Sequence, residues 1–261
     1  MGASAISGLS EKLLQELYVG SLGDPGKYMQ AMTPACALAL AANFGSVERW
    51  RDEFIAKGKS MGGGSGWLLL VFQPRQGTLL NQCVADHTQV LAGGVPVLAL
   101  ALAVALVPGR HEHADHPDDG AAAGTDGDAL MARIDWADVY ERYRLAVNSA
   151  SEAPGAALGA SADQAAGAVL IDVRRAGVLD ATSTVILGAN WRDPASVGNW
   201  AAEMPADREV IVYCVHGHEV SRATALRLRA AGLKARYLRG GIEAWQAAGR
   251  PLAEKAKAWV P

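Results

Sequence analysis

The stretch that decides the fold is VIVYCVHGHEVSRATALRLRAAG, residues 210–232. It opens with apolar residues that suit a strand buried inside a parallel sheet, and it then turns through a polar segment around Cys214. From Val220 the spacing of the apolar residues predicts an amphipathic helix, which Gly232 closes. This order places the turn at the carboxyl edge of an α/β sheet, where functional residues gather.

Three neighbouring segments extend this reading. VLIDV (169–173) and KARYL (234–238) are short apolar runs that predict further strands, and IEAWQAAG (242–249) predicts a closing helix. The alternation of strands and helices predicts an α/β domain with a doubly wound parallel sheet over residues 160–256.

The region before it carries another pattern. Thr33 is the expected cap of a helix over ACALALAANF, and Ser46 that of a helix over VERWRDEFIAKGK. GWLLLVF and TLLNQC predict a pair of strands, Val95–Val107 a buried apolar segment, and 135–147 a helix. We therefore predict an α+β domain over residues 9–147 and a linker, rich in Ala, Ser, Gly and Pro, over 148–159.

Composition narrows the function classes. The 261 residues carry a net charge of -3 and an isoelectric point near 6.1, and no basic stripe appears, so we expect no nucleic-acid partner. The three cysteines are few and unpaired in spacing, which favours a reducing compartment. The longest apolar run, Val95–Val107, is too short to span a bilayer as a helix, so we expect no membrane association and a cytoplasmic location.

Cys214 is the candidate nucleophile. At a strand-to-helix turn, backbone amides and the helix dipole favour the thiolate over the thiol. His216, His218 and Arg222 are expected to add positive charge, whereas Glu219 opposes the thiolate unless it points to solvent. The alternative is an inert cysteine buried at the end of a strand. The glycine and the two histidines after the cysteine favour the functional reading.

Residues 168–252 resemble a rhodanese domain. LIDVRR is similar to the family's Asp-Val-Arg strand end, VIVYCVHGHEVS to its Cys-x-x-Gly loop, and YLRGGIEAW to its closing Leu-x-Gly-Gly-x-x-x-Trp motif. The resemblance implies a sulfurtransferase that needs no cofactor and takes sulfur from a small donor such as thiosulfate. A thiol or a cyanide-like acceptor would then receive the sulfur. It implies a persulfide on Cys214, cradled by the backbone of residues 215–219 (Val215, His216, Gly217, His218, Glu219), with Asp172 and Arg174 near the site as an internal ion pair.

Two positions depart from the family pattern. Leu187 stands where the family usually has proline, which loosens a turn. Val220 stands six residues after the cysteine, where phosphatases built on this fold need an arginine to clamp phosphate, and Arg222 comes two positions too late. We therefore favour sulfur transfer over phosphoryl transfer.

Residues 9–145 resemble the iron/manganese superoxide dismutases, mainly their C-terminal domain. The resemblance lies in the order of NFGSVERWRDEF, GGGSGWLLLVF, LLNQCVADH, LAGGVPVLAL and RIDWADVYERY. Members of this family usually dimerise through this domain, so a homodimer is an open possibility here. Fold alone does not establish activity, because function depends on the residues of the site.

The metal ligands of such an enzyme are three histidines and one aspartate. His113 takes one histidine place, but Gly109 stands where the aspartate four residues earlier would be, and Gln15 stands at another histidine position. Gln82 matches a glutamine that tunes metal-bound solvent in some members. We therefore expect a lost metal site and no dismutase activity. Iron or manganese would be a cofactor only if this site works, and HEHADH (111–116) is a second, weaker metal candidate.

Three functions remain open at this point. The first is a sulfurtransferase attached to a dismutase-like domain without its metal. The second is an iron- or manganese-dependent superoxide dismutase with an accessory rhodanese domain. The third is a sulfur carrier or docking module without catalysis.

Overall fold

The structure is a computed structural model that describes residues 2–22, 32–60, 66–85, 94–101 and 131–255. The chain divides into two compact units. The first comprises Met1–Phe72 and Leu79–Tyr143, and the second comprises Gln73–Thr78 and Arg144–Pro261. Each unit is described by itself.

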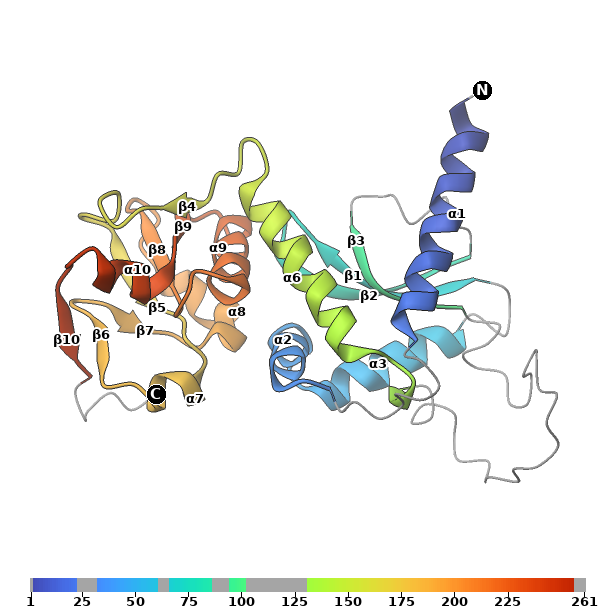
Figure 1. Cartoon of the computed structure of the whole chain (residues 1–261), viewed down its shortest axis with the longest axis horizontal. Helices are drawn as coiled ribbons and strands as arrows, with labels where there is room; N and C mark the ends of the chain where they lie inside the picture. Colours follow the sequence, from blue (N-terminus) through green and yellow to red (C-terminus); the bar gives the residue numbers. More distant parts are fainter. Residues whose placement is uncertain (1, 23–31, 61–65, 86–93, 102–130, 256–261) are drawn as a thin grey trace. The chain divides into compact units, whose positions relative to one another are not determined.

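The first unit is α+β. It contains helices α1 (Gly2–Ser21), α2 (Pro34–Phe44) and α3 (Val47–Ser60), strands β1 (Trp67–Gln73), β2 (Thr78–Val84) and β3 (Val95–Ala101), and the start of α6 (Trp136–Glu152). The strands form one sheet in the order β2-β1-β3, with β1 and β3 antiparallel (Figure 1).

Local sequence signals account for these helices. The Thr33 side chain accepts a hydrogen bond from the Cys36 amide at 3.2 Å, and the Ser46 hydroxyl accepts one from the Arg49 amide at 3.1 Å. Both are N-caps that satisfy amides left free at a helix start. The helix predicted to end at Val147 continues to Glu152, because alanines and short polar residues extend it past the apolar spacing that marked it.

The core of this unit is built on aromatic contacts. Trp50 lies 5.2 Å from Phe54 and 5.4 Å from Trp136 between ring centroids, and all three are buried. The Trp50 indole donates a hydrogen bond to the buried Asn81 side chain at 3.0 Å. This bond satisfies the polar atom of an otherwise apolar cluster.

The second unit contains a parallel sheet of five strands in the order β4-β9-β8-β5-β7. This confirms the fold class predicted for residues 160–256. The strands are β4 (Gly159–Ala160), β5 (Val169–Asp172), β7 (Asn190–Trp191), β8 (Val210–Tyr213) and β9 (Ala235–Leu238). A separate antiparallel pair joins β6 (Thr184–Ile186) to β10 (Leu252–Glu254).

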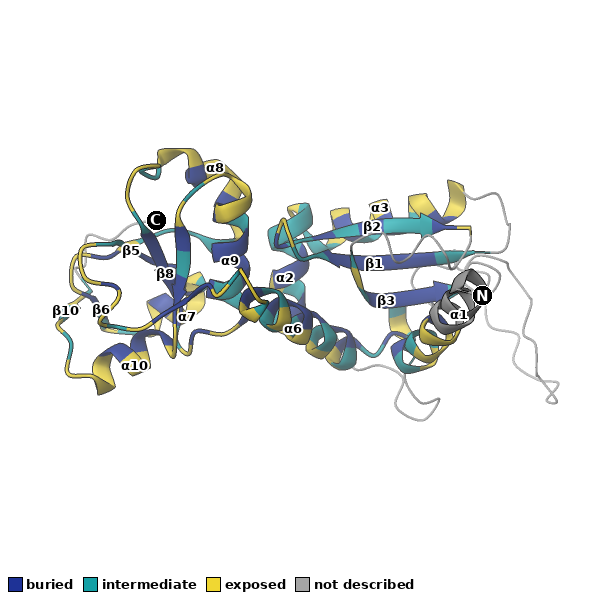
Figure 2. Cartoon of the chain, turned by 90° about the horizontal axis from the view of Figure 1, so that it is seen from above, coloured by how far each residue is buried: buried dark blue, intermediate teal, exposed yellow. Residues whose placement is uncertain are grey.

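Helices connect these strands. They are α7 (Ala176–Asp180), α8 (Val197–Trp200), α9 (Glu219–Ala230) and α10 (Gly241–Ala247), with short 3-10 turns at Pro194–Ser196 and Ala201–Glu203. Central strand β8 is buried along its whole length, as Figure 2 shows in dark blue. Its apolar run is therefore typical of a strand covered on both faces.

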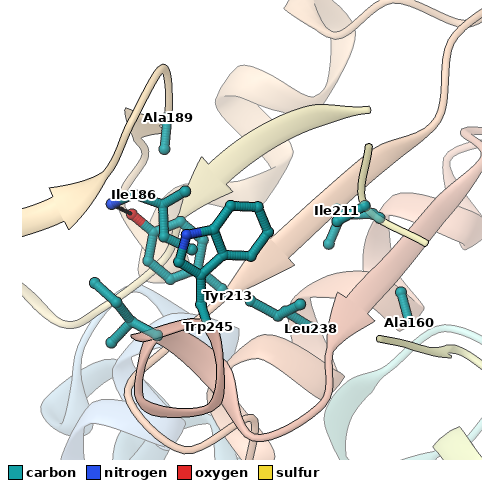
Figure 3. Packing of buried hydrophobic residues seen from close by; sticks show 9 residues of the cluster. Ala160, Ile186, Ala189, Ile211, Tyr213, Leu238 and Trp245 are labelled. Carbon is teal, nitrogen blue, oxygen red and sulfur yellow. Dashed lines mark hydrogen bonds between the residues drawn. The ribbon is translucent and has the colours of Figure 1, made fainter. Parts of the chain in front are cut away.

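One face of the parallel sheet packs under α10. Tyr213 and Ile211 from β8 meet Leu238 from β9 and Trp245 from α10 in a single buried cluster (Figure 3). The Tyr213 hydroxyl accepts a hydrogen bond from the Ile186 amide at 3.2 Å, which ties β6 to the end of β8. Since side chains alternate along a strand, Val210 and Val212 point to the opposite face.

No helix in the described parts of the chain is both long enough and apolar enough to cross a membrane.

Candidate active site

Cys214 follows β8 directly and precedes the first turn of α9, as the sequence predicted. Its side chain is buried, and its Sγ lies 3.3 Å from the Oγ of Ser221. Ser221 is fully buried and was missed by the sequence analysis. Its position in the first turn of the helix was the signal that could have identified it, because a side chain there can reach back to the loop. Either atom can be the donor in this contact, and the Ser221 hydroxyl also lies 3.3 Å from the His218 carbonyl oxygen, to which it can donate.

The loop after the cysteine leaves backbone donors unused. Within the described residues, the amides of 215–218 find no hydrogen-bond acceptor on the protein. They precede the N-terminus of α9, whose N-cap is His218. Consecutive free amides at a helix start form a concave site that favours an anion.

Two glycines, Gly217 and Gly241, allow the Cys214 loop to pack closely against the backbone of residues 238–243. The amide of Ile242 donates to the Cys214 carbonyl at 3.0 Å, and that of Glu243 donates to the Val215 carbonyl at 3.3 Å. Gly241 has φ +59°, and a Cβ there would stand 2.2 Å from the Val215 oxygen. Gly217 has φ +70°, and a Cβ there would stand 2.6 Å from the Leu238 carbonyl oxygen. The close approach explains why glycine stands at both positions.

Glu219 does not point to solvent. It is buried, and its Oε1 lies 3.4 Å from the Nη2 of Arg175. From the sequence, Glu219 was expected to oppose the thiolate unless it pointed to solvent, and Arg175 had no predicted role. The ion pair with Arg175 is what allows this carboxylate to be buried.

Arg222 is not directed at the sulfur, contrary to the expectation that it adds positive charge there. Its Nη1 donates to Glu152 Oε1 and to Ser151 Oγ, both at 2.9 Å, and its guanidinium stacks on Tyr237 at 4.4 Å from the ring centroid. Its Nε donates to the Gly217 carbonyl at 2.9 Å. The bond to Gly217 holds the loop backbone, and the bond to Glu152 engages the charge of the guanidinium.

The same group of residues changes the pKa of the Glu152 carboxylate. The hydrogen bond from the Tyr237 hydroxyl, followed by the Arg222 guanidinium, lowers the pKa of Glu152. Burial and the neighbouring Glu152 raise the pKa of Tyr237. The carboxylate thus stays ionised and the phenol stays protonated, which preserves the brace on Arg222.

The predicted ion pair between Asp172 and Arg174 is present and almost completely buried. Arg174 Nη2 lies 2.6 Å from Asp172 Oδ2, with side-chain exposures of 2% and 0%. The Tyr213 hydroxyl donates to the same carboxylate at 3.0 Å, and burial with the adjacent Asp172 raises the pKa of Tyr213. Arg174 also donates to Thr182 and to the Thr184 carbonyl. Besides Thr182 and Thr184, the backbone carbonyls of the pair accept hydrogen bonds from the Trp191 indole and the Arg192 amide, and within the described residues no hydrogen bond joins the pair to Cys214.

The two histidines lie on the outer side of the loop. His216 is exposed and its Nδ1 lies 2.9 Å from Glu243 Oε2. The His216 and His218 rings lie 5.3 Å apart between centroids. They are placed at the loop as predicted, and one of them is coupled to a carboxylate that the sequence analysis did not name.

The other two cysteines have different surroundings. Burial raises the pKa of the Cys36 thiol to about 12. Burial also raises the pKa of Cys83, against the smaller opposing effect of Lys57. Both are therefore expected to remain thiols near neutral pH.

The metal predictions fall partly outside the described residues. His113, Gly109 and the whole of HEHADH lie there. Gln82 is half-buried on β2, and Gln15 is exposed on α1. Within the described ranges, no three His, Cys, Asp or Glu side chains are grouped closely enough to hold a metal ion. The described residues by themselves therefore do not supply a ligand set for iron or manganese.

Comparison with known proteins gives two family matches. Residues 159–248 match the rhodanese-like domain, and residues 32–142 match the C-terminal domain of iron/manganese superoxide dismutases. The first match contains the whole Cys214 loop, and the second contains β1, β2 and β3.

Curated relatives of the chain are dismutases. A superoxide dismutase (Fe) of Cupriavidus metallidurans is 46% identical over 135 residues, which cover 52% of this chain and 62% of that protein. A superoxide dismutase (Mn) 1 of Halobacterium salinarum is 37% identical over 128 residues, covering 46% of this chain and 58% of that protein. The chain thus spans less than two thirds of the length of either relative.

Among solved structures, a rhodanese-related protein of Thermoplasma volcanium is similar, with 21% identity and a TM-score of 0.33. The match covers 36% of this chain and 96% of that one. The family matches and the topology agree on the arrangement of the sequence. The chain is a fusion of an iron/manganese superoxide dismutase-like domain with a rhodanese-like domain.

Proposed function

We propose that the chain is a rhodanese-type sulfurtransferase that carries a sulfane sulfur as a persulfide on Cys214. The observation that carries the proposal is the Cys214 loop itself. A buried sulfur contacts the Ser221 hydroxyl at 3.3 Å, beside the amides of 215–218, which have no acceptor in the described protein. Neutral donors around one sulfur stabilise the charge of a thiolate and then of a persulfide.

The chemistry takes two steps. The Cys214 thiolate attacks the sulfane sulfur of a donor, and the bond between that sulfur and the rest of the donor breaks. The electron pair leaves with the donor remnant, which is sulfite from thiosulfate or a thiol from a hydropersulfide. An acceptor thiol or cyanide then attacks the outer sulfur, and Cys214 departs as a thiolate.

The other residues position this sulfur. Arg222 holds the Gly217 carbonyl, and the amides of Ile242 and Glu243 hold the carbonyls of Cys214 and Val215. We assign Asp172 and Arg174 to fixing the ends of β5 and β8. The reaction as proposed uses no cofactor, and we propose a cytoplasmic setting, where a thiol stays reduced.

The test is the mass of the full-length chain after treatment with a sulfane-sulfur donor. We expect one added sulfur atom, located on Cys214 by peptide mapping, and none in the variant Cys214→Ser. Cys83→Ser is the matched control and should load like the wild type. Repeated transfer to cyanide or a thiol would distinguish a catalyst from a passive carrier. If Cys214 gains no sulfur from thiosulfate or from a hydropersulfide, the proposal is wrong.

A second candidate function is superoxide dismutation by the first domain. It is supported by the 46% identity to the Cupriavidus metallidurans enzyme over 135 residues. Against it stands Gly109, at the position where the resemblance to the dismutases implies an aspartate ligand. The measurement is the iron and manganese content of the purified chain together with its dismutation rate. Stoichiometric metal with activity would establish this function beside sulfur transfer.

A further inference from the structure

We infer that Glu219 makes the Cys214 loop select hydropersulfide donors over dianionic donors such as thiosulfate. The inference rests on the proposed function, because it concerns which donor loads the same sulfur. It assigns Glu219 as a specificity-determining residue of the loop.

The first step is the place of the carboxylate. Glu219 is the first residue of α9, two positions before Ser221, whose hydroxyl contacts the sulfur. It is 8% exposed, so water screens its charge poorly. A second carboxylate, Glu243, lies at the outer side of the loop on His216. Each carboxylate thus occupies a basic group of the loop, Glu219 the Arg175 guanidinium and Glu243 the His216 ring.

The positive charge at the loop is already paired with carboxylates. Two arginines contact the loop within the described part of the chain. Arg175 is paired with Glu219 itself, and Arg222 is bonded to Glu152. The position six residues after the cysteine is Val220. Both guanidinium charges are thus matched by carboxylates, and a doubly charged donor gains little from either.

The loop offers neutral hydrogen-bonding groups to a bound sulfur. The amides of 215–218 are neutral hydrogen-bond donors, and the Ser221 hydroxyl is a neutral polar group 3.3 Å from the sulfur. They suit the single charge on the outer sulfur of a persulfide. Thiosulfate brings three sulfonate oxygens and a second charge, for which the loop offers no arginine that is free of a carboxylate. The lack of a free cation therefore acts more strongly on the thiosulfate dianion than on a hydropersulfide, which carries at most one charge.

The favoured loading step balances as follows. The Cys214 thiolate attacks the outer sulfur of R–S–SH, a new S–S bond forms, and the original S–S bond breaks. The proton passes to the departing sulfur, which leaves as R–SH. Cys214 retains the sulfane sulfur as a persulfide anion, and no outside oxidant or reductant is consumed.

The experiment compares two donors on the full-length chain at one pH and one ionic strength. The probes are 2-hydroxyethyl hydropersulfide and thiosulfate, and the readout is the second-order rate of sulfur addition to Cys214 by quenched mass spectrometry. We expect Glu219→Gln to raise the thiosulfate rate about tenfold and to change the hydropersulfide rate by less than about twofold. Glu209→Gln is the matched control. It precedes β8 at the opposite edge of the sheet and pairs with Arg236, and it should change neither rate.

Loading by hydropersulfide shows that the Glu219→Gln variant is folded. If that variant loads with neither donor, Arg175→Gln carries the test, since loss of the compensating cation should lower the thiosulfate rate about tenfold. An unchanged ratio of the two rates in the variant that loads would overturn the inference and leave the proposed function intact. Failure of both donors to load the wild type would instead overturn the proposed function.

Discussion

At the residue scale, Asp172 and Arg174 show how charge is accommodated inside the second unit. Two opposite charges are buried at the end of β5, and each is satisfied by several hydrogen bonds. Tyr213 joins the carboxylate from β8, and Thr182 receives a bond from the guanidinium. The pair therefore links β8, which ends directly before Cys214, to β5 and to the segment before β6.

We expect Arg174→Met to lower the unfolding free energy of this unit by about 3–5 kcal/mol, because it leaves the Asp172 charge buried without its partner. Hydrogen exchange of peptides that cover β8 measures the change in the second unit alone. Arg208→Met is the control, since Arg208 makes an exposed contact with the Gly167 carbonyl. Equal protection in the two variants would mean that the pair contributes little.

The sequence predicted this ion pair and the position of Cys214, but it did not predict the partners of Glu219 and Arg222. A motif fixes which residues share a turn, so Cys214, His216 and Gly217 could be placed from their order. The partners of long side chains depend on other elements. Arg222 reaches Glu152, at the end of α6, and Arg175 lies after β5. These contacts cross long sequence separations that no local pattern encodes.

At the element scale, the Gly240–Gly241 turn at the start of α10 determines how closely the Cys214 loop can pack against that helix. A Cβ on Gly241 would stand 2.2 Å from the Val215 oxygen and 2.4 Å from the Cys214 oxygen. Backbone atoms have little freedom to move aside, so the loop would have to shift. A shift of about 1 Å in a reactive group can cost about a hundredfold in rate.

We therefore expect Gly241→Ala to lower the rate of sulfur addition to Cys214 by about a hundredfold. Gly249→Ala provides a matched control. Gly249 also has a positive φ, of +65°, but a Cβ there would have no heavy atom within 4 Å. The control carries the same kind of backbone strain without the collision. Equal rates in the two variants would show that the close contact does not position the loop.

Element order was more predictable than element length. The apolar runs of β1, β8 and β9 and the capped helices α2 and α3 were found because burial and capping leave strong periodic or local signals. The two-residue strand β4 and the pairing of β6 with β10 were not expected. Their pairing partners lie far apart in the chain, and runs of two or three residues carry no periodicity.

At the scale of the whole molecule, the two regions that match enzyme families are separate parts of one chain. The proposed sulfur transfer depends on Cys214, whose contacts with Ser221 and Ile242 lie within the described residues of the second unit. Dismutation would depend on the first domain and on His113, which lies outside the described residues. The two activities should therefore respond independently to loss of metal and loss of the cysteine.

We expect removal of metal from the full-length chain by chelation to leave the rate of sulfur addition to Cys214 unchanged, because the groups that hold its loop are amides, carbonyls, a hydroxyl and a guanidinium. Any dismutation that the untreated chain shows should be lost by the same treatment and kept in Cys214→Ser. Rates of sulfur addition and of dismutation, measured on one preparation before and after chelation, check both statements. A fall in sulfur addition that returns with iron or manganese would contradict the separation, since it would mean that the first domain takes part in the chemistry at Cys214.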